Sequence, residues 1–83
     1  MSAIEATIAS IVCEVGELPE QEFQPEDQFS DLGIDSLGAI EIVVKVEAGC
    51  GIHFSDEEMG LIRSFGDLVA LTQRHLALKE ELA

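Results

Sequence analysis

The chain has 83 residues, enough for one small domain around a single hydrophobic core. Its 17 acidic residues outnumber four basic ones and give a formal net charge of −13. Such a charge repels phosphate backbones and anionic lipid, so the sequence predicts no nucleic-acid partner and no membrane insertion. It would instead attract basic patches on other proteins.

The cysteines and histidines form no pattern typical of a disulfide framework or a metal site. The spacing of Cys13 and Cys50 fits no metal motif, and His53 and His75 lie in no ligand pattern with them. We interpret both cysteines as reduced, small hydrophobic residues. The N-terminal stretch has no basic region and no run of transmembrane length, so a reducing cytoplasm is the expected location. We expect a monomer.

The first helix is predicted over residues 2–15. Ser2 followed by Glu5 matches the capping-box pattern, in which each residue would satisfy a free backbone N–H group of the other. Apolar residues then recur with the period of a helix. They are Ile4, Ile8, Ile11, Val12 and Val15.

A long loop is predicted over residues 16–35. Two prolines interrupt the helical period, and most residues between them are acidic or amide. Phe23, Phe29 and Leu32 are expected to pin the loop to the core. A loop this long in a small domain usually has a role in function or packing.

The pattern of the next segment leaves two structures open. In "AIEIVVKV", residues 39–46, every second residue from Ile40 to Val46 is a β-branched apolar residue, and two of the three residues between them are charged. This alternation and the β-branched residues favour a strand. A helix over residues 36–48 would instead gather two apolar faces. One consists of Ala39, Ile42, Val43 and Val46, and the other consists of Leu37, Ile40 and Val44 beside Glu41 and Glu47. The second face, edged with carboxylates, would be a docking surface for an apolar, basic partner.

Two more helices are predicted in the last third of the chain. Each follows a serine that has an acidic residue three positions further on, which is the capping-box pattern. The pairs are Ser55 with Glu58 before a short helix over residues 56–62, and Ser64 with Asp67 before a final helix over residues 65–80.

Three roles are open for Ser36, at the start of the helix over residues 36–48. As a cap it does poorly, because Ala39 stands where a capping box needs an acid, and Asp35 is the better N-cap. As a nucleophile it has no base placed near it, and Ile34 stands where the G-x-S-x-G motif requires glycine. As a modification site it is well placed, since a helix start favours an attached anion such as a monoanionic phosphodiester.

The stretch "DLGIDSLGAIEIVVKVE", residues 31–47, resembles the acyl carrier protein family. The family's D-L-G-x-D-S-L motif is met by Asp31, Leu32, Gly33, Asp35, Ser36 and Leu37, and Glu41 and Glu47 follow at the family's spacing. The length, the acidity, the long first loop and the short third helix are similar too. The resemblance implies an all-α, four-helix bundle with a long loop between the first two helices and a short third helix. It favours a helix over a strand for residues 36–48.

The resemblance also implies a function and a site. The chain would be a non-catalytic carrier, and a phosphopantetheinyl transferase would attach 4′-phosphopantetheine from coenzyme A to Ser36, between Asp35 and Leu37. The arm would then hold acyl groups as thioesters. Acyltransferases, ketosynthases or ligase-type enzymes with basic docking patches would recognise a surface formed by Asp35, Leu37, Ile40, Glu41, Val44 and Glu47. Candidates to line an acyl cleft are Ile42, Val43, Val46 and Ile62.

Three departures from the family pattern indicate a dedicated carrier in a specialised pathway. Gly38 replaces a polar or acidic residue, Lys45 adds a positive charge, and Ala48 replaces a common acid. Gly38 also weakens the first helical turn by about 1 kcal/mol relative to alanine. Fatty-acid and polyketide biosynthesis both fit, and polyketide assembly is favoured. The alternatives are a peptidyl (aminoacyl) carrier protein and an acidic protein-binding adaptor without a prosthetic group.

Overall fold

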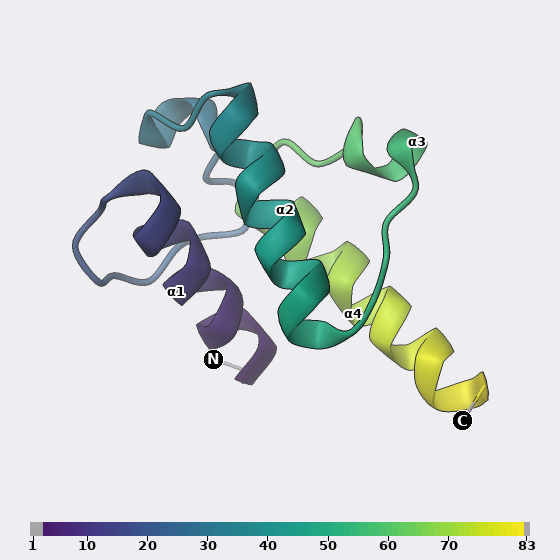
Figure 1. Cartoon of the computed structure of the whole chain (residues 1–83). Coiled ribbons are helices and arrows are strands. Elements are labelled where there is room, and N and C mark those ends of the chain that lie inside the picture. The colour runs from purple at the N-terminus through teal and green to yellow at the C-terminus, as the bar shows by residue number, and fades with distance from the viewer. Residues whose placement is uncertain (1–2, 83) are drawn as a thin grey trace.

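The computed structural model describes residues 3–82, and its regular elements are helical (Figure 1). They are α1 (Ala3–Gly16), the 3₁₀ helix η1 (Ser30–Leu32), α2 (Ser36–Cys50), α3 (Asp56–Met59) and α4 (Phe65–Leu82). Within residues 3–82 the backbone forms no strand, only an isolated antiparallel bridge between Gln28 and Ser64. The predicted all-α, four-helix fold is confirmed, and residues 39–46 are helical despite their strand-like alternation.

α3 is shorter than predicted, because it ends at Met59 and not at residue 62. Gly60, which is unfavourable inside a helix, follows directly. Beyond it the chain leaves the helical path, and the Arg63 carbonyl accepts a hydrogen bond from the Phe29 N–H at 3.1 Å. The helices predicted over residues 2–15, 36–48 and 65–80 begin and end within two residues of the observed bounds.

Two of the predicted capping boxes are formed. At the start of α3, the Glu58 N–H donates to Ser55 Oγ (3.1 Å) and the Ser55 N–H donates to Glu58 Oε1 (2.9 Å). At the start of α4, the Asp67 N–H donates to Ser64 Oγ (3.1 Å) and the Ser64 N–H donates to Asp67 Oδ2 (3.2 Å). The box predicted for the first helix involves Ser2, which lies outside the described residues.

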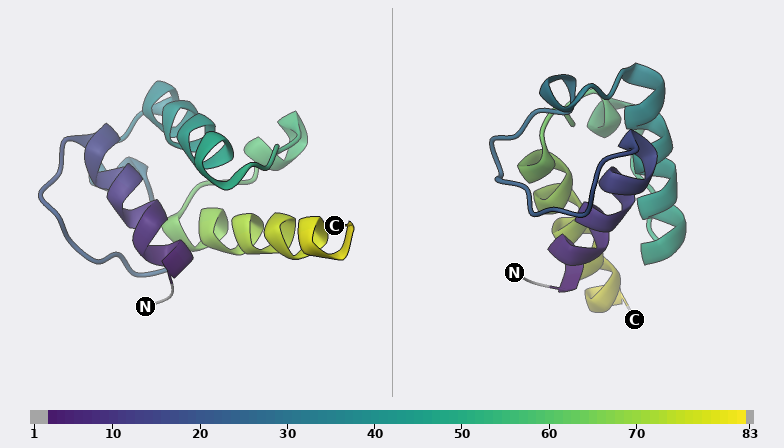
Figure 2. Two further views of the ribbon diagram at one scale, coloured as in Figure 1. Left: turned by 60° about the horizontal axis from the view of Figure 1, so that its bottom comes forward. Right: turned by 90° about the vertical axis from the view of Figure 1, so that its left-hand side faces the viewer.

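The core lies between α1, α2 and α4. α3 stands at the opposite end of the molecule from α1, with α2 and α4 between them (Figure 2). The side chains that are most deeply buried come from all three long helices and from the segment before α3. They are Ile8, Val12, Ile42, Val46, Phe54, Leu68 and Thr72.

The long loop between α1 and α2 is anchored at several points. Phe23 and Phe29 are buried and Leu32 is partly buried against the core, as predicted. The rings of Phe23 and Phe65 pack with their centroids 5.4 Å apart. The backbone N–H groups of Phe65 and Gly66 donate to loop carbonyls at 2.9 and 3.0 Å. The loop therefore has a fixed path that leads into the start of α2.

Candidate functional site

The start of α2 holds Ser36 at the surface. After η1 ends at Leu32, Gly33 adopts a left-handed conformation with φ of 79°, which turns the chain toward α2. Asp35 is the N-cap, and its Oδ1 accepts a hydrogen bond from the Gly38 N–H at 2.8 Å. Asp35 therefore caps the helix, as predicted. Ser36 is exposed, and its hydroxyl forms no hydrogen bond within residues 3–82.

A cleft of about 220 Å³ lies between α2 and α3, and Ser36 is part of its wall. The rest of this α2–α3 cleft is apolar and consists of Ala39, Ile40, Val43, Met59 and Ile62. A group attached to Ser36 can therefore place an apolar chain out of water.

Two of the four residues predicted to line an acyl cleft lie in the α2–α3 cleft, and two do not. Val43 and Ile62 lie in the α2–α3 cleft. Ile42 and Val46 do not, because they lie on the side of α2 that packs against the other long helices, where they are almost completely buried. Met59 was not predicted, because nothing in the sequence shows which side of so short a helix faces α2.

Three apolar side chains on α2 are exposed. Leu37, Ile40 and Val44 are 77%, 55% and 51% exposed, and their spacing places them on one face of the helix. The exposed carboxylates of Asp35 and Glu41 flank them. These five residues are called the α2 strip below. They are five of the six residues predicted for partner recognition.

Glu47, the sixth residue of that prediction, has a different place. Its side chain is only 14% exposed. Its carboxylate accepts a hydrogen bond from the Phe54 N–H at 2.8 Å and lies 3.1 Å from Nδ1 of His53. Glu47 thus fixes the segment that follows α2.

Comparison with known proteins shows the family. Residues 6–72 match the family model described as the phosphopantetheine attachment site. The chain is 38% identical over 63 residues to an acyl carrier protein of Acidothermus cellulolyticus, with 75% of each chain covered. The chain belongs to the acyl carrier protein family. It is also 42% identical over 79 residues to the meromycolate extension acyl carrier protein of Mycobacterium tuberculosis, with 94% of this chain covered, and it spans 66% of that relative's length.

Solved acyl carrier protein structures have the same fold. The holo acyl carrier protein of Geobacter metallireducens matches with a TM-score of 0.83 and 26% identity, covering 98% of this chain and 93% of that one. The acyl carrier protein of Thermotoga maritima matches with a TM-score of 0.78 and 30% identity, covering 94% and 88%. The predicted acyl carrier protein family is confirmed. None of the helices within residues 3–82 is long and apolar enough to cross a membrane.

Two departures of this acyl carrier protein from the family pattern have structural explanations. A Cβ atom at Gly38 would lie 2.9 Å from Cγ2 of the buried Ile34, so glycine makes room for that side chain. Lys45 Nζ lies 3.0 Å from Oε1 of Glu14 on α1, so its charge is paired between the two helices. Neither residue belongs to the α2 strip.

Glu58 ties α3 to α4. Its Oε2 lies 2.9 Å from Nε2 of His75, and its Oε1 accepts the Ser55 N–H. The His75 ring in turn packs edge-on against Phe54, with the ring centroids 5.0 Å apart. The hydrogen bond from the Ser55 backbone, followed by that with His75, lowers the pKa of the Glu58 carboxyl from 4.5 to about 2.

Glu58→Gln is expected to make the protein less sensitive to acid. Because the folded-state pKa is depressed, ionised Glu58 stabilises the fold above pH 4.5, and this contribution is lost as the pH falls from 4.5 toward 2. Glutamine keeps the capping-box position but does not titrate. Thermal melts across that range should show a smaller loss of melting temperature than in the wild type. Glu57→Gln, at an exposed position of α3, is the control, and equal losses in both variants would contradict the role of Glu58.

His53 and His75 each contact a glutamate, and within residues 3–82 the Ser36 hydroxyl forms no hydrogen bond with either histidine. The serine–histidine pair that nucleophilic catalysis requires is therefore not formed among these residues.

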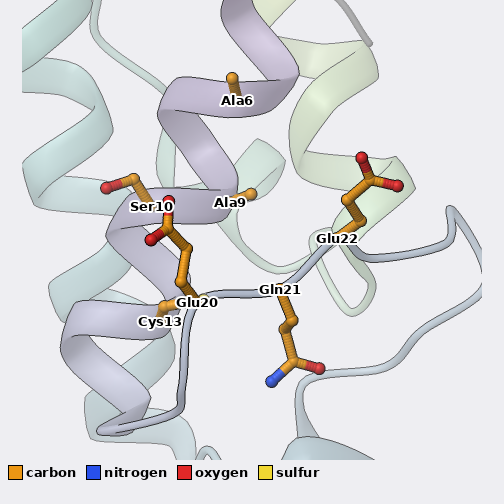
Figure 3. Close-up of a pocket in the computed structure, with 7 residues that line it drawn as sticks. All are labelled: Ala6, Ala9, Ser10, Cys13, Glu20, Gln21 and Glu22. Atoms are coloured by element: carbon orange, nitrogen blue, oxygen red, sulfur yellow. The ribbon is translucent and has the colours of Figure 1, made fainter.

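A separate hollow of about 270 Å³ lies between α1 and the loop (Figure 3). Ser36 is not part of it. Cys13, which is a free thiol, donates a weak hydrogen bond from Sγ to the Pro19 carbonyl at 3.5 Å and so helps to hold the loop. The side chain of Gln21 points away from α1 in Figure 3. The hollow is lined by Ala6, Ala9, Ser10, Cys13, Glu20, Gln21 and Glu22.

Proposed function

We propose that 4′-phosphopantetheine is attached to Ser36 of this carrier. The observation that supports it best is the exposed hydroxyl of Ser36 at the first residue of α2, left without a hydrogen bond in residues 3–82 because Asp35 is the cap. The site fits the group, since this hydroxyl can form the phosphodiester and an apolar cleft adjoins it. When bound, the group supplies the terminal thiol that holds acyl groups as thioesters.

The chain's own residues would present and protect the cargo. Asp35 fixes the first turn of α2 and with it the position of Ser36. Val43, Met59 and Ile62 in the α2–α3 cleft would shield the apolar part of an acyl chain from water. The carrier needs no catalytic group for this role, because its partner enzymes perform the acyl transfers.

The α2 strip is the surface that we assign to those partners. Its apolar centre and acidic edge suit a docking site that has an apolar pocket bordered by Lys and Arg side chains. The phosphopantetheinyl transferase must reach Ser36 beside the strip. Acyltransferases, ketosynthases or ligase-type enzymes would then use the same surface, in the cytoplasm where coenzyme A and these enzymes are available.

The cargo that we infer is an acyl intermediate of a chain-extending pathway of the fatty-acid or polyketide type. The M. tuberculosis relative is a meromycolate extension acyl carrier protein, which supports chain extension. The apolar cleft suits an aliphatic chain better than the charged aminoacyl group of a peptidyl carrier. Because Gly38 and Lys45 have packing and pairing roles, they no longer favour polyketide assembly over fatty-acid synthesis.

Incubation of the apo protein with coenzyme A and a promiscuous phosphopantetheinyl transferase tests this function. The intact mass is expected to rise by one phosphopantetheine. Acyl-coenzyme A in place of coenzyme A should give the acylated carrier directly. An adaptor without a prosthetic group would show no change in mass and would bind its partner unmodified.

Glu41→Lys is expected to weaken docking. Reversal of this charge on the α2 strip should reduce kcat/KM of a transferase with a basic docking patch by about tenfold at low salt, mainly through slower association. The free energy of unfolding should change by less than about 0.5 kcal/mol, because Glu41 is exposed. Steady-state assays and thermal melts measure both.

The matched control for this experiment is Glu57→Lys, an equal charge reversal on α3. High salt screens charges, so it should reduce the difference in kcat/KM between Glu41→Lys and Glu57→Lys. Equal losses of kcat/KM in both, or unfolding of Glu41→Lys, would contradict a docking role for the strip.

A further inference from the structure

A second hollow, of about 200 Å³, also contains Ser36. It lies between the start of α2, the end of the long loop and the segment before α4, and is called the loop-side hollow below. Its polar lining includes Ser30, Asp35, Ser36 and Arg63, of which Arg63 alone carries a positive charge. The loop-side hollow and the α2–α3 cleft share Ser36, Ala39 and Ile62.

The backbone of Arg63 is held in place on both sides. Its N–H donates to Oδ2 of Asp67 at 3.1 Å, and its carbonyl accepts the Phe29 N–H at 3.1 Å. The next residue, Ser64, forms the isolated bridge with Gln28. The attachment point of this side chain is therefore fixed relative to the loop that leads to Ser36.

The guanidinium of Arg63 has no ion pair or hydrogen bond within residues 3–82, although acidic residues outnumber basic ones by 17 to four. Lys45, by contrast, pairs with Glu14, and Lys79 donates to the Cys50 carbonyl. Arg63 thus has an exposed charge that the fold does not use, on a residue that lines the same hollow as Ser36.

A phosphodiester on Ser36 would need such a cation. The Asp35 carboxylate is adjacent, and it already accepts the Gly38 N–H, so this N–H group of the first turn is not available to a second anion. The net charge of −13 adds a general repulsion. A guanidinium offsets both effects, because its planar set of donors matches the oxygens of a phosphate group.

We propose that Arg63 binds the phosphodiester of 4′-phosphopantetheine on Ser36 and so positions the root of the arm in the loop-side hollow. This proposal rests on the attachment of the group to Ser36. It makes Arg63 a positioning residue that reduces the repulsion between the new anion and Asp35. The transfer chemistry itself does not involve it.

NMR of the ¹⁵N-labelled protein tests the contact without an activity assay. The Nε–Hε resonance of Arg63 is expected to shift when the apo protein is converted to the holo protein with coenzyme A and a transferase. Arg74 of α4 is the internal control, because it lines a different hollow, with Leu61 and Leu71. Equal shifts of the two arginines would overturn the proposal.

Thermal melts of variants provide a second readout. Arg63→Gln should lower the melting temperature of the holo protein by about 1 to 5 °C more than that of the apo protein. Arg74→Gln should affect both forms equally, and high salt should reduce the Arg63 effect. Equal effects of Arg63→Gln on apo and holo protein would overturn the proposal. If the protein gained no mass, the attachment to Ser36 would be overturned as well. If it gained the mass but Arg63→Gln lowered the melting temperatures of apo and holo protein equally, this proposal alone would be overturned.

Discussion

Ser36→Ala is expected to abolish the attachment of phosphopantetheine and to leave the fold intact. The residue is exposed and its hydroxyl forms no hydrogen bond within residues 3–82, so its removal costs no internal hydrogen bond. Asp35 keeps the cap, and alanine is the better helix former by about 0.5 kcal/mol. The melting temperature should therefore stay equal or rise slightly. Mass spectrometry after incubation with coenzyme A and a transferase measures the loss of modification.

Ser30→Ala is the matched control for this loss. Ser30 is also exposed and lines the same loop-side hollow, but it lies in η1 and not at the start of α2. This variant should be modified as completely as the wild type. Modification of Ser36→Ala, or loss of modification in both variants, would contradict attachment at Ser36.

Gly66→Ala is expected to destabilise the fold by about 2 kcal/mol, or roughly 10 °C in melting temperature. A Cβ atom there would lie 2.8 Å from the Pro25 carbonyl oxygen and 3.0 Å from its Cα, both of them backbone atoms. The Gly66 N–H also donates to that carbonyl at 3.0 Å, so the loop cannot move away without losing the bond. Thermal or urea unfolding followed by circular dichroism measures the loss.

Gly49→Ala is the matched control and should act in the opposite direction. Apart from its chain neighbours and the backbone of its own helix, no atom lies within 4 Å of a Cβ at Gly49, which is exposed on α2. Its replacement should stabilise the protein by about 0.5 to 1 kcal/mol through helix propensity alone. If Gly66→Ala also raised the melting temperature, the loop would not be anchored to α4 as described.

Local chemistry explains why much of the fold could be predicted. The capping boxes of Ser55 and Ser64 depend on residues three positions apart, and both are formed. The cap at Asp35 could be identified because Ala39 rules out a box at Ser36. Once residues 36–48 are taken as a helix, the exposure of the α2 strip follows from the carboxylates that edge this one of its two apolar faces.

The remaining features depend on contacts between distant segments. Glu41 and Glu47 are both acidic residues among apolar residues of α2, so the sequence does not distinguish them. In the structure the Glu47 carboxylate accepts a hydrogen bond from the Phe54 N–H. α3 ends early because the chain beyond it must reach Phe29. The need for glycine at position 66 arises from Pro25, which is far away in the sequence. No local pattern contains this information.

The role of Arg63 shows the same limit at the site. In the sequence, Arg63 lies far from the D-S-L motif. A single arginine between the end of α3 and the capping box of α4 matches no binding motif. The backbone hydrogen bond between Phe29 and Arg63 and the bridge between Gln28 and Ser64 bring it to the hollow that Ser36 lines.

Fragmentation of the intact holo protein in the mass spectrometer tests the attachment site most directly. The protein recovered after incubation with coenzyme A and a transferase should carry one phosphopantetheine, and every fragment that retains it should contain Ser36. A folded protein that gains no mass, or an arm located on any other residue, would contradict the account.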